Sequence, residues 1–186
     1  MNTHYTLVLF IITSTAKSKP LDEQARLHKN SSAMENTTSS WRYSLRRATA
    51  GDAPAICQII SAVNNNPLAL DWQRFVIATD GQGRLVGCGQ VKPHKDGSLE
   101  LASIAVQPEW RGRGIARAII EHLLQGYPGR LYLTCRSELG PLYGKFGFEP
   151  VQLAEMPPYF KRIRRVVTLF NKLSRRADKL LVMRRN

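Results

Sequence analysis

Apolar side chains change their spacing several times along this chain, and each change predicts a new element of secondary structure. Alternating apolar and polar residues are typical of strands, whereas apolar residues three and four positions apart are typical of helices. Strands are predicted at 43–48, 75–78, 85–91, 99–106, 131–135, 148–153 and 180–183. Helices are predicted through 56–63, 115–124, 142–145 and about 159–176.

The order of these elements indicates a mixed α/β architecture. Three short strands between residues 75 and 106, separated by turn sequences, favour an antiparallel meander. Gly87 and Gly89 interrupt the second of these strands, which indicates that another element approaches its backbone closely. Beyond residue 106, helix and strand alternate, as in a sheet with helices packed on it.

The first forty residues differ in composition from the rest of the 186-residue chain. Residues 13–40 are rich in Ser, Thr and Asn and show little periodicity, and the apolar run 7–12 is far shorter than the roughly 20 residues of a spanning helix. We therefore divide the chain into an extension, 1–40, and one domain, 41–186. The extension is expected to be disordered or to be a targeting segment, with an organelle transit peptide or a secretory signal as the alternatives.

Positive charge is concentrated near the end of the chain. The formal net charge is +13, and residues 160–186 contain ten Lys or Arg but a single acidic residue, Asp178. The helix predicted at about 159–176 is therefore basic on one face. That face is either exposed to water or binds an anionic partner, for example a ribosome, a nucleic acid or anionic lipid.

Three cysteines, Cys57, Cys88 and Cys135, are scattered through the chain. None forms a C-x-x-C pair or lies at zinc-ligand spacing from a histidine, so no metal site is predicted. We expect reduced thiols in the core, which favours a reducing compartment such as the cytoplasm.

The sharpest chemical signal is the sequence between the strand 99–106 and the helix that follows it. Gly112 and Gly114 allow a tight turn, and the helix opens directly after them at Ile115. The first amides of a helix have no partner within the helix and attract anions, and Arg111 and Arg113 add positive charge. The turn can accept a pyrophosphate; a basic turn with a purely structural role is the alternative.

Residues 111–116, Arg-Gly-Arg-Gly-Ile-Ala, resemble the acetyl-CoA signature of the GNAT acetyltransferase superfamily. Residues 142–148, Leu-Tyr-Gly-Lys-Phe-Gly-Phe, resemble a second segment of that family at a suitable distance. The resemblance covers roughly residues 43–151. It implies a GNAT-like acyl-CoA N-acyltransferase fold, in which a mixed sheet is splayed between its fourth and fifth strands and flanked by helices.

The resemblance also implies acetyl-CoA as co-substrate, with no metal. Backbone groups of Ile104, Ala105 and Val106 would pair with the pantetheine arm, and one of these amides could stabilise an oxyanion. The pyrophosphate would bind to the turn that carries the family's signature. In this chain the turn consists of Arg111, Gly112, Arg113, Gly114, Ile115 and Ala116.

Two residues match the catalytic positions of the family. Tyr143 matches the acid near the CoA sulfur, and its structural alternative is a core aromatic. Glu100, eleven residues before Arg111, matches a glutamate base, and its alternative is a carboxylate in water or in an ion pair. Strand alternation predicts that Glu100 shares a face with Ala102 and Ile104. We assign no role to His94.

Other positions make the assignment less complete. Arg136 stands where many members have a cofactor-binding asparagine, and Cys135, which could in principle carry an acetyl group, is interpreted as a core thiol. The loop after the first helix would contact the acceptor amine. Its candidate residues are Asn64, Asn65, Asn66 and Trp72.

The function predicted from the sequence is transfer of acetyl from acetyl-CoA to a primary amine by direct attack in a ternary complex. Two alternatives belong to other classes. One is a non-catalytic CoA-binding or regulatory module with the same fold, and the other is a basic protein associated with nucleic acid or ribosomes. Aromatic residues make up only 8 % of the chain, which disfavours a base-stacking surface.

Overall fold

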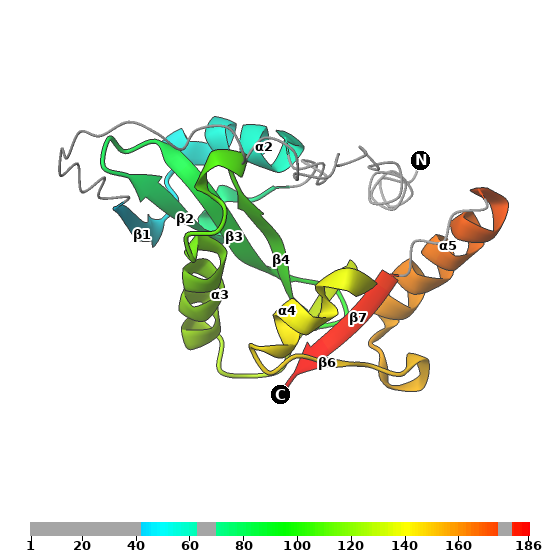
Figure 1. Cartoon of the computed structure of the whole chain (residues 1–186). Coiled ribbons are helices and arrows are strands. Elements are labelled where there is room, and N and C mark those ends of the chain that lie inside the picture. The colour runs from blue at the N-terminus through cyan, green and yellow to red at the C-terminus, as the bar shows by residue number, and fades with distance from the viewer. Residues whose placement is uncertain (1–41, 63–69, 175–179) are drawn as a thin grey trace, which may run out of the picture.

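The computed structural model describes residues 42–62, 70–174 and 180–186, apart from the side chains of 170–174. These residues form a seven-stranded sheet of order β1-β2-β3-β4-β5-β7-β6 with helices on both faces (Figure 1). The strands are β1 Tyr43–Arg47, β2 Phe75–Asp80, β3 Leu85–Pro93, β4 Leu99–Val106, β5 Leu131–Arg136, β6 Glu149–Pro150 and β7 Leu180–Arg185. The helices are α2 Ala53–Ala62, α3 Ile115–Gly126, α4 Gly140–Gly144 and α5 Pro158–Ser174.

The strand pairing confirms the mixed α/β architecture. Strands β1 to β4 form an antiparallel meander, β5 lies parallel to β4, and β7 pairs antiparallel with both β5 and β6. The strand predicted at 148–153 was too long, because β6 comprises only Glu149 and Pro150. Pro150 has no amide to donate, and a 3-10 turn already begins at Leu153.

Two hydrophobic layers sandwich the meander. Val76 and Ala78 on β2 pack with Ile115, Ile119 and Leu123 of α3 on one face of the sheet. The alternate residues of β2, Phe75 and Ile77, pack with Ile56, Ile59 and Ile60 of α2 on the opposite face. Because both faces are covered, all six residues of β2 are buried.

Two glycines of β3 let α3 lie close to the sheet, as their positions in the sequence predicted. A Cβ atom on Gly89 would lie 2.8 Å from Cγ2 of Ile119, and one on Gly87 would lie 2.9 Å from Cγ2 of Ile115. Atoms that close must move apart, so larger side chains here would displace α3. The close packing fixes the position of the first turn of α3, which borders the candidate site.

The α2 side of the sheet also carries α5. Tyr132 of β5 and Phe160 of α5 belong to a smaller core cluster, with ring centroids 5.1 Å apart. Helix α5 begins at Pro158, close to the predicted start, and its buried stripe consists of Phe160, Ile163 and Val167. Residues 175 and 176, the predicted end of this helix, lie outside the described residues.

All three cysteines are free, but one of them is not in the core. Cys88 and Cys135 are buried as predicted, whereas Cys57 is exposed. Cys57 falls between Ile56 and Ile59 in sequence, and the helical rotation of about 100° per residue turns it away from their buried face.

The expectation for residues 1–40 concerns a segment that the structure does not describe. Within residues 42–62, 70–174 and 180–186, no helix is both long and apolar enough to cross a bilayer.

Candidate functional site

Strands β4 and β5 share only one backbone bridge among the described residues. A single parallel bridge joins Glu100 to Tyr132, although β4 is paired with β3 from Leu99 to Val106. On its other side β5 is paired with β7 along its whole length, from Leu131 to Arg136. The two strands therefore diverge from Glu100 toward the end of β4, and their facing edges are open to an extended ligand.

A bulge at Ser103 changes the direction of the side chains in β4. Cys88 of β3 pairs with Ala105, but Gln90 pairs with Ala102, so β4 contains one more residue than β3 over this stretch. Ser103 has a φ of 57°, and its hydroxyl oxygen accepts a hydrogen bond from Nε2 of Gln90 at 3.0 Å. Such bulges re-aim side chains and backbone groups and are frequent beside functional sites.

The bulge makes one prediction from strand alternation wrong. Ile104 was expected on the same face as Glu100, but its Cδ1 atom lies where Gly89 faces Ile119, on the α3 side. Leu101 also packs on the α3 side, so Glu100 points to the opposite face. One inserted residue is enough to reverse the alternation beyond it.

The turn between β4 and α3 is open and positively charged. Gly112 and Gly114 have φ values of 76° and 77°, and no atom lies within 4 Å of a Cβ built on either residue. The first hydrogen bond of α3 runs from the amide of Ala118 to the carbonyl of Gly114 at 2.9 Å. The amides immediately before Ala118 thus have no acceptor within the helix, which is the geometry of an anion site.

The two arginines of this turn are held in place by their neighbours. Nε of Arg111 donates to the carbonyl of Val106 at 3.3 Å. The guanidinium of Arg113 lies over the ring of Trp110, 4.9 Å from its centroid. Both charges therefore stay beside the open amides, and the residues present fit a pyrophosphate.

Tyr143 lies on α4, half-buried against the main core. Its ring packs edge-on against Phe148, with centroids 6.3 Å apart. Burial raises the pKa of Tyr143 to about 12, and repulsion from the negative charge of a Cys135 thiolate adds to the effect. At neutral pH the phenol is thus protonated and can donate a proton or a hydrogen bond.

Cys135, at the end of β5, is close enough to Tyr143 to influence its titration. Burial raises the pKa of the Cys135 thiol to about 11, and Glu138 adds to the shift. Only the thiolate is a good nucleophile, so this thiol is poorly reactive near pH 7. The interpretation of Cys135 as a core thiol agrees with this environment.

Glu100 is buried, and both of its carboxylate oxygens are engaged. Oε1 accepts from the hydroxyl of Thr134 at 2.9 Å, and Oε2 lies 2.8 Å from Nε2 of His94. A carboxylate can only accept hydrogen bonds, so Nε2 of His94 carries the donated proton. The side chains of His94 and Glu100 are only 5 % and 8 % exposed.

His94 is the residue that the sequence analysis missed. Its ring stacks on Tyr159 of α5, with centroids 3.4 Å apart and planes inclined by 18°. Pro93 pairs with Leu99 across the β3–β4 turn, which brings His94 and Glu100 together. The hairpin was the signal available in the sequence. His94 directly follows Pro93 and Glu100 directly follows Leu99, so the pairing of Pro93 with Leu99 places the two side chains near each other.

The family model described as "Acetyltransferase (GNAT) domain" matches residues 71–150. These residues form a GNAT domain. The match runs from just before β2 to the end of β6 and includes the divergent strands, the α3 turn and Tyr143. The family match therefore holds for residues 71–150.

Curated relatives are similar over a little less than half of this chain. A mycothiol acetyltransferase of Rhodococcus jostii is 39 % identical over 87 residues, covering 45 % of this chain and 28 % of its own length. An amino-acid acetyltransferase of Mycobacterium tuberculosis is 34 % identical over 91 residues, covering 44 % of this chain and 52 % of its own length. The chain thus spans from about a quarter to half of these relatives.

Solved structures share the fold more widely. N-acetylglutamate synthase of Neisseria gonorrhoeae, complexed with coenzyme A and L-arginine, has a TM-score of 0.61 at 21 % identity, covering 77 % of this chain and 33 % of that one. A Mycobacterium tuberculosis protein in complex with CoA has a TM-score of 0.59 at 23 % identity, covering 76 % and 98 %. At these identities the similarity shows the fold of the GNAT domain.

The structure describes only part of the candidate acceptor residues. Asn64, Asn65 and Asn66 lie outside the described residues. Trp72 begins a 3-10 turn, Trp72–Arg74, and packs half-buried against the α2-side core. Arg136, at the position that departs from the family pattern, is exposed and forms an ion pair with Glu138 at 3.5 Å.

The described part of the chain, 42–62, 70–174 and 180–186, contains no group of three His, Cys, Asp or Glu side chains able to hold a metal ion.

Proposed function

We propose that this chain is an N-acetyltransferase that moves acetyl from acetyl-CoA to a primary amine by direct attack in a ternary complex. The observation that carries this proposal is the gap between β4 and β5, which lies beside the open, positively charged first turn of α3. The relatives named above are acetyltransferases, and two structures of the same fold contain CoA.

Two sets of backbone groups would hold the co-substrate. Ile104, Ala105 and Val106, on the open edge of β4, would pair with the pantetheine arm. The pyrophosphate would lie on the amides of residues 111–116, with Arg111 and Arg113 supplying charge. Acetyl-CoA, when bound, supplies an acyl group already activated as a thioester.

Glu100 would act as the base, directly or through water. An alkyl amine with a pKa near 10.4 is almost wholly protonated at pH 7, so it must lose a proton before it can attack. His94 is a positioning residue in this scheme, because its hydrogen bond and its stacking on Tyr159 fix the orientation of the carboxylate.

Tyr143 would act as the acid toward the departing thiolate, since its raised pKa keeps the phenol protonated at neutral pH and able to donate to the sulfur. The poorly reactive thiol of Cys135 favours direct attack by the amine over a covalent acetyl-cysteine. We also propose a cytoplasmic location, supported by the free cysteines at 57, 88 and 135, since such thiols persist where the surroundings are reducing.

Titration calorimetry of the full chain with acetyl-CoA tests the cofactor site. The site variant is Arg111→Glu, Gly114→Glu, and the matched control is Arg130→Glu, Gly126→Glu, which changes the charge equally at exposed positions away from the turn. Circular dichroism must show that both variants are folded. We expect saturable binding by the wild type and the control and none by the site variant; no binding by a folded wild type overturns the proposal.

A screen of primary amines for CoA release then tests turnover. Release that depends on both the amine and Glu100 supports the acetyltransferase. Saturable acetyl-CoA binding without release from any amine would overturn catalysis and leave the CoA-binding module as the function of this fold.

A further inference from the structure

The side of α5 that points away from the sheet is exposed along the helix. Four exposed residues at i, i+4, i+7 and i+11 form one stripe there, opposite the buried stripe of the same helix. They are Pro158, Arg162, Arg165 and Leu169. Lys161 and Arg164, which are half-buried, flank this stripe. We call these six residues the outer face of α5.

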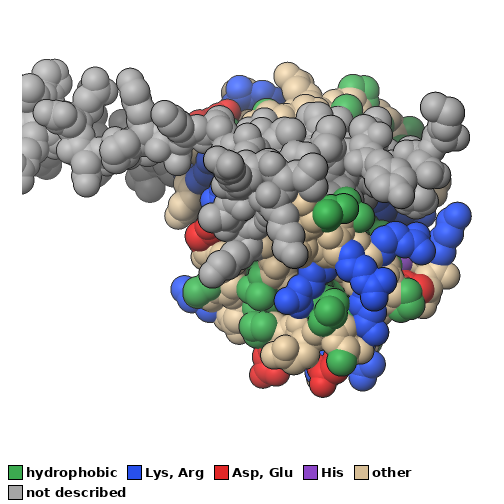
Figure 2. Space-filling view, turned by 90° about the vertical axis from the view of Figure 1, so that its right-hand side faces the viewer, with side chains coloured by type: hydrophobic (Ala, Val, Ile, Leu, Met, Phe, Trp, Pro, Cys, Tyr) green, Lys and Arg blue, Asp and Glu red, His purple; other side chains and the backbone are tan. Residues whose placement is uncertain are grey.

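The positive charge of the outer face is not offset by nearby acidic side chains. Helix α5 contains no Asp or Glu. Among residues 42–62, 70–174 and 180–186, no carboxylate forms an ion pair with any of the four cations of the outer face. Glu155, in the turn before the helix, pairs with Arg184 instead, at 3.5 Å. Figure 2 shows Lys and Arg gathered on the side of the molecule that carries α5, with hydrophobic side chains between them.

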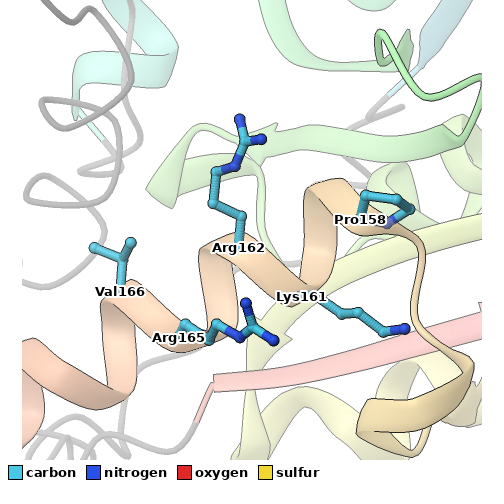
Figure 3. A pocket seen from close by; sticks show the side chains of 5 residues that line it. All are labelled: Pro158, Lys161, Arg162, Arg165 and Val166. Carbon is cyan, nitrogen blue, oxygen red and sulfur yellow. The ribbon is translucent and has the colours of Figure 1, made fainter.

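The cations are spread over a surface and do not converge on one point. Figure 3 shows Arg162 leaving α5 on one side and Lys161 and Arg165 on the other. The hollow between them is lined also by Pro158 and Val166. Side chains that diverge in this way cannot surround one small anion. On a helix that lies flat they can each contact a separate phosphate in a plane of lipid headgroups.

Two exposed leucines distinguish this face from one that contacts only phosphates. Leu169 is 61 % exposed, and Leu153, in the turn before the helix, is 43 % exposed. Both line a second hollow, together with Arg164, Arg165 and Thr168. Leucines beside basic side chains can enter the boundary between headgroups and acyl chains. Binding of single-stranded nucleic acid relies on aromatic stacking instead, and none of the residues that line these two hollows is aromatic.

We propose that the outer face of α5 binds the surface of a membrane that contains anionic phospholipids. Helix α5 would lie flat on the bilayer, with its four cations at the phosphates and with Leu153 and Leu169 just below them. Charge attraction and a small buried apolar area would hold the protein there reversibly. This inference is independent of the proposed acetyltransferase function.

Sedimentation of the full chain with lipid vesicles tests the proposal. Vesicles of phosphatidylcholine alone are compared with vesicles that contain about one third phosphatidylglycerol, at about 0.15 M salt. We expect at least ten-fold stronger binding to the anionic vesicles. Each cation near such a surface strengthens binding roughly five-fold, so the double variant Arg162→Gln, Arg165→Gln should bind about twenty-fold more weakly.

Two matched controls separate position from composition. Arg47→Gln, Arg130→Gln changes the net charge equally at exposed positions outside α5, and it should weaken binding less than about three-fold. Leu169→Ser leaves the charge unchanged and should weaken binding about three- to ten-fold. Leu139→Ser, at a leucine outside α5 that is 40 % exposed, should have no effect. Circular dichroism confirms that each variant is folded.

A parallel titration with fluorescently labelled single-stranded RNA tests nucleic acid as the partner. All variants keep residues 1–40, so any binding through that segment is common to them. Equal binding to neutral and anionic vesicles, or equal losses in the α5 double variant and its control, would overturn the inference. Tighter binding to RNA than to anionic vesicles, or vesicle binding unaffected by Leu169→Ser, would overturn it as well. Acetyl-CoA binding by the same variants should match the wild type, so none of these results bears on the acetyltransferase.

Discussion

His94 and Glu100 form a pair that is buried between the sheet and α5. Replacing His94 by Ala would leave Oε2 of Glu100 without its donor at 2.8 Å, so the carboxylate could turn away from the amine. We expect kcat to fall about ten-fold, with no change in the affinity for acetyl-CoA, and His94→Gln to restore part of the loss. Steady-state kinetics with calorimetry check this; an unchanged kcat in a folded variant would show that the pair is only structural.

Tyr143 should remain protonated over the whole working range of the enzyme. Its pKa is raised to about 12, so the limb of the pH–rate profile that reports its ionisation should not appear below about pH 11. Tyr143→Phe should lower kcat by about ten- to a hundred-fold, because the phenol oxygen is removed while the ring still packs on Phe148. The control is Tyr127→Phe at the end of α3, which should keep wild-type kcat.

The first turn of α5 is fixed by a residue from another element. Oδ2 of Asp96, in the β3–β4 turn, accepts the amide of Tyr159 at 2.8 Å, and Oδ1 accepts the hydroxyl of Ser98 at 2.6 Å. Asp96 therefore caps α5 from outside the helix. This bond, together with the stacking of His94 on Tyr159, connects α5 to the hairpin that carries Glu100.

The pH dependence of this cap has a definite sign. Burial tends to raise the pKa of Asp96, but hydrogen bonds from the Ser98 hydroxyl, the Tyr159 amide and the Ser98 amide outweigh it, and the pKa is lowered. The stabilisation is therefore complete above the unfolded value of about 3.9 and is lost as the pH falls through the lower folded value.

Asp96→Ala should reduce the free energy of unfolding by about 0.5–1 kcal/mol at pH 6, toward the low end of cap energies because Asp96 is exposed. The difference in free energy of unfolding between Asp96→Ala and the wild type should shrink below about pH 3.9. Urea denaturation at pH 6 and at pH 3 measures this difference. Asp71→Ala, which removes the cap of the 3-10 turn at Trp72, serves as the control and should leave amide exchange in α5 unchanged. A difference as large at pH 3 as at pH 6 would contradict the assignment to an ionised cap.

Elements with a strong local pattern could be predicted from the sequence. Strand β4 matches its predicted range because apolar alternation and flanking turns define both ends, and α3 begins where Gly114 permits a positive φ. The bulge could not be predicted, since nothing in the sequence around Ser103 marks a φ of 57°. Strand β6 was overestimated because only Glu149 and Pro150 of the segment 148–153 pair as a strand, although apolar and polar residues are interspersed along it.

Over the whole molecule, local pattern predicts which elements exist but says little about which of them become neighbours. The candidate cofactor turn is continuous in sequence, so residues 111–116 could be selected in advance. The Glu100 environment is assembled from β4, β5 and the β3–β4 turn, with α5 against it, and Thr134 lies 34 positions away in sequence. His94 could be recognised only once the hairpin register was known.

The single bridge between Glu100 and Tyr132 has a consequence for the mechanics of the sheet. The β1–β4 half and the β5–β7–β6 half share little backbone bonding, so each half can flex about that bridge. Deuterium should enter the amides that face the gap quickly in the free protein. If acetyl-CoA lies between the strands, it connects the two halves and opposes their relative movement. These amides should then exchange more than ten-fold more slowly at saturating ligand, while the amides between β5 and β7 should change little. Uniform slowing across both halves would instead indicate general stabilisation of the fold.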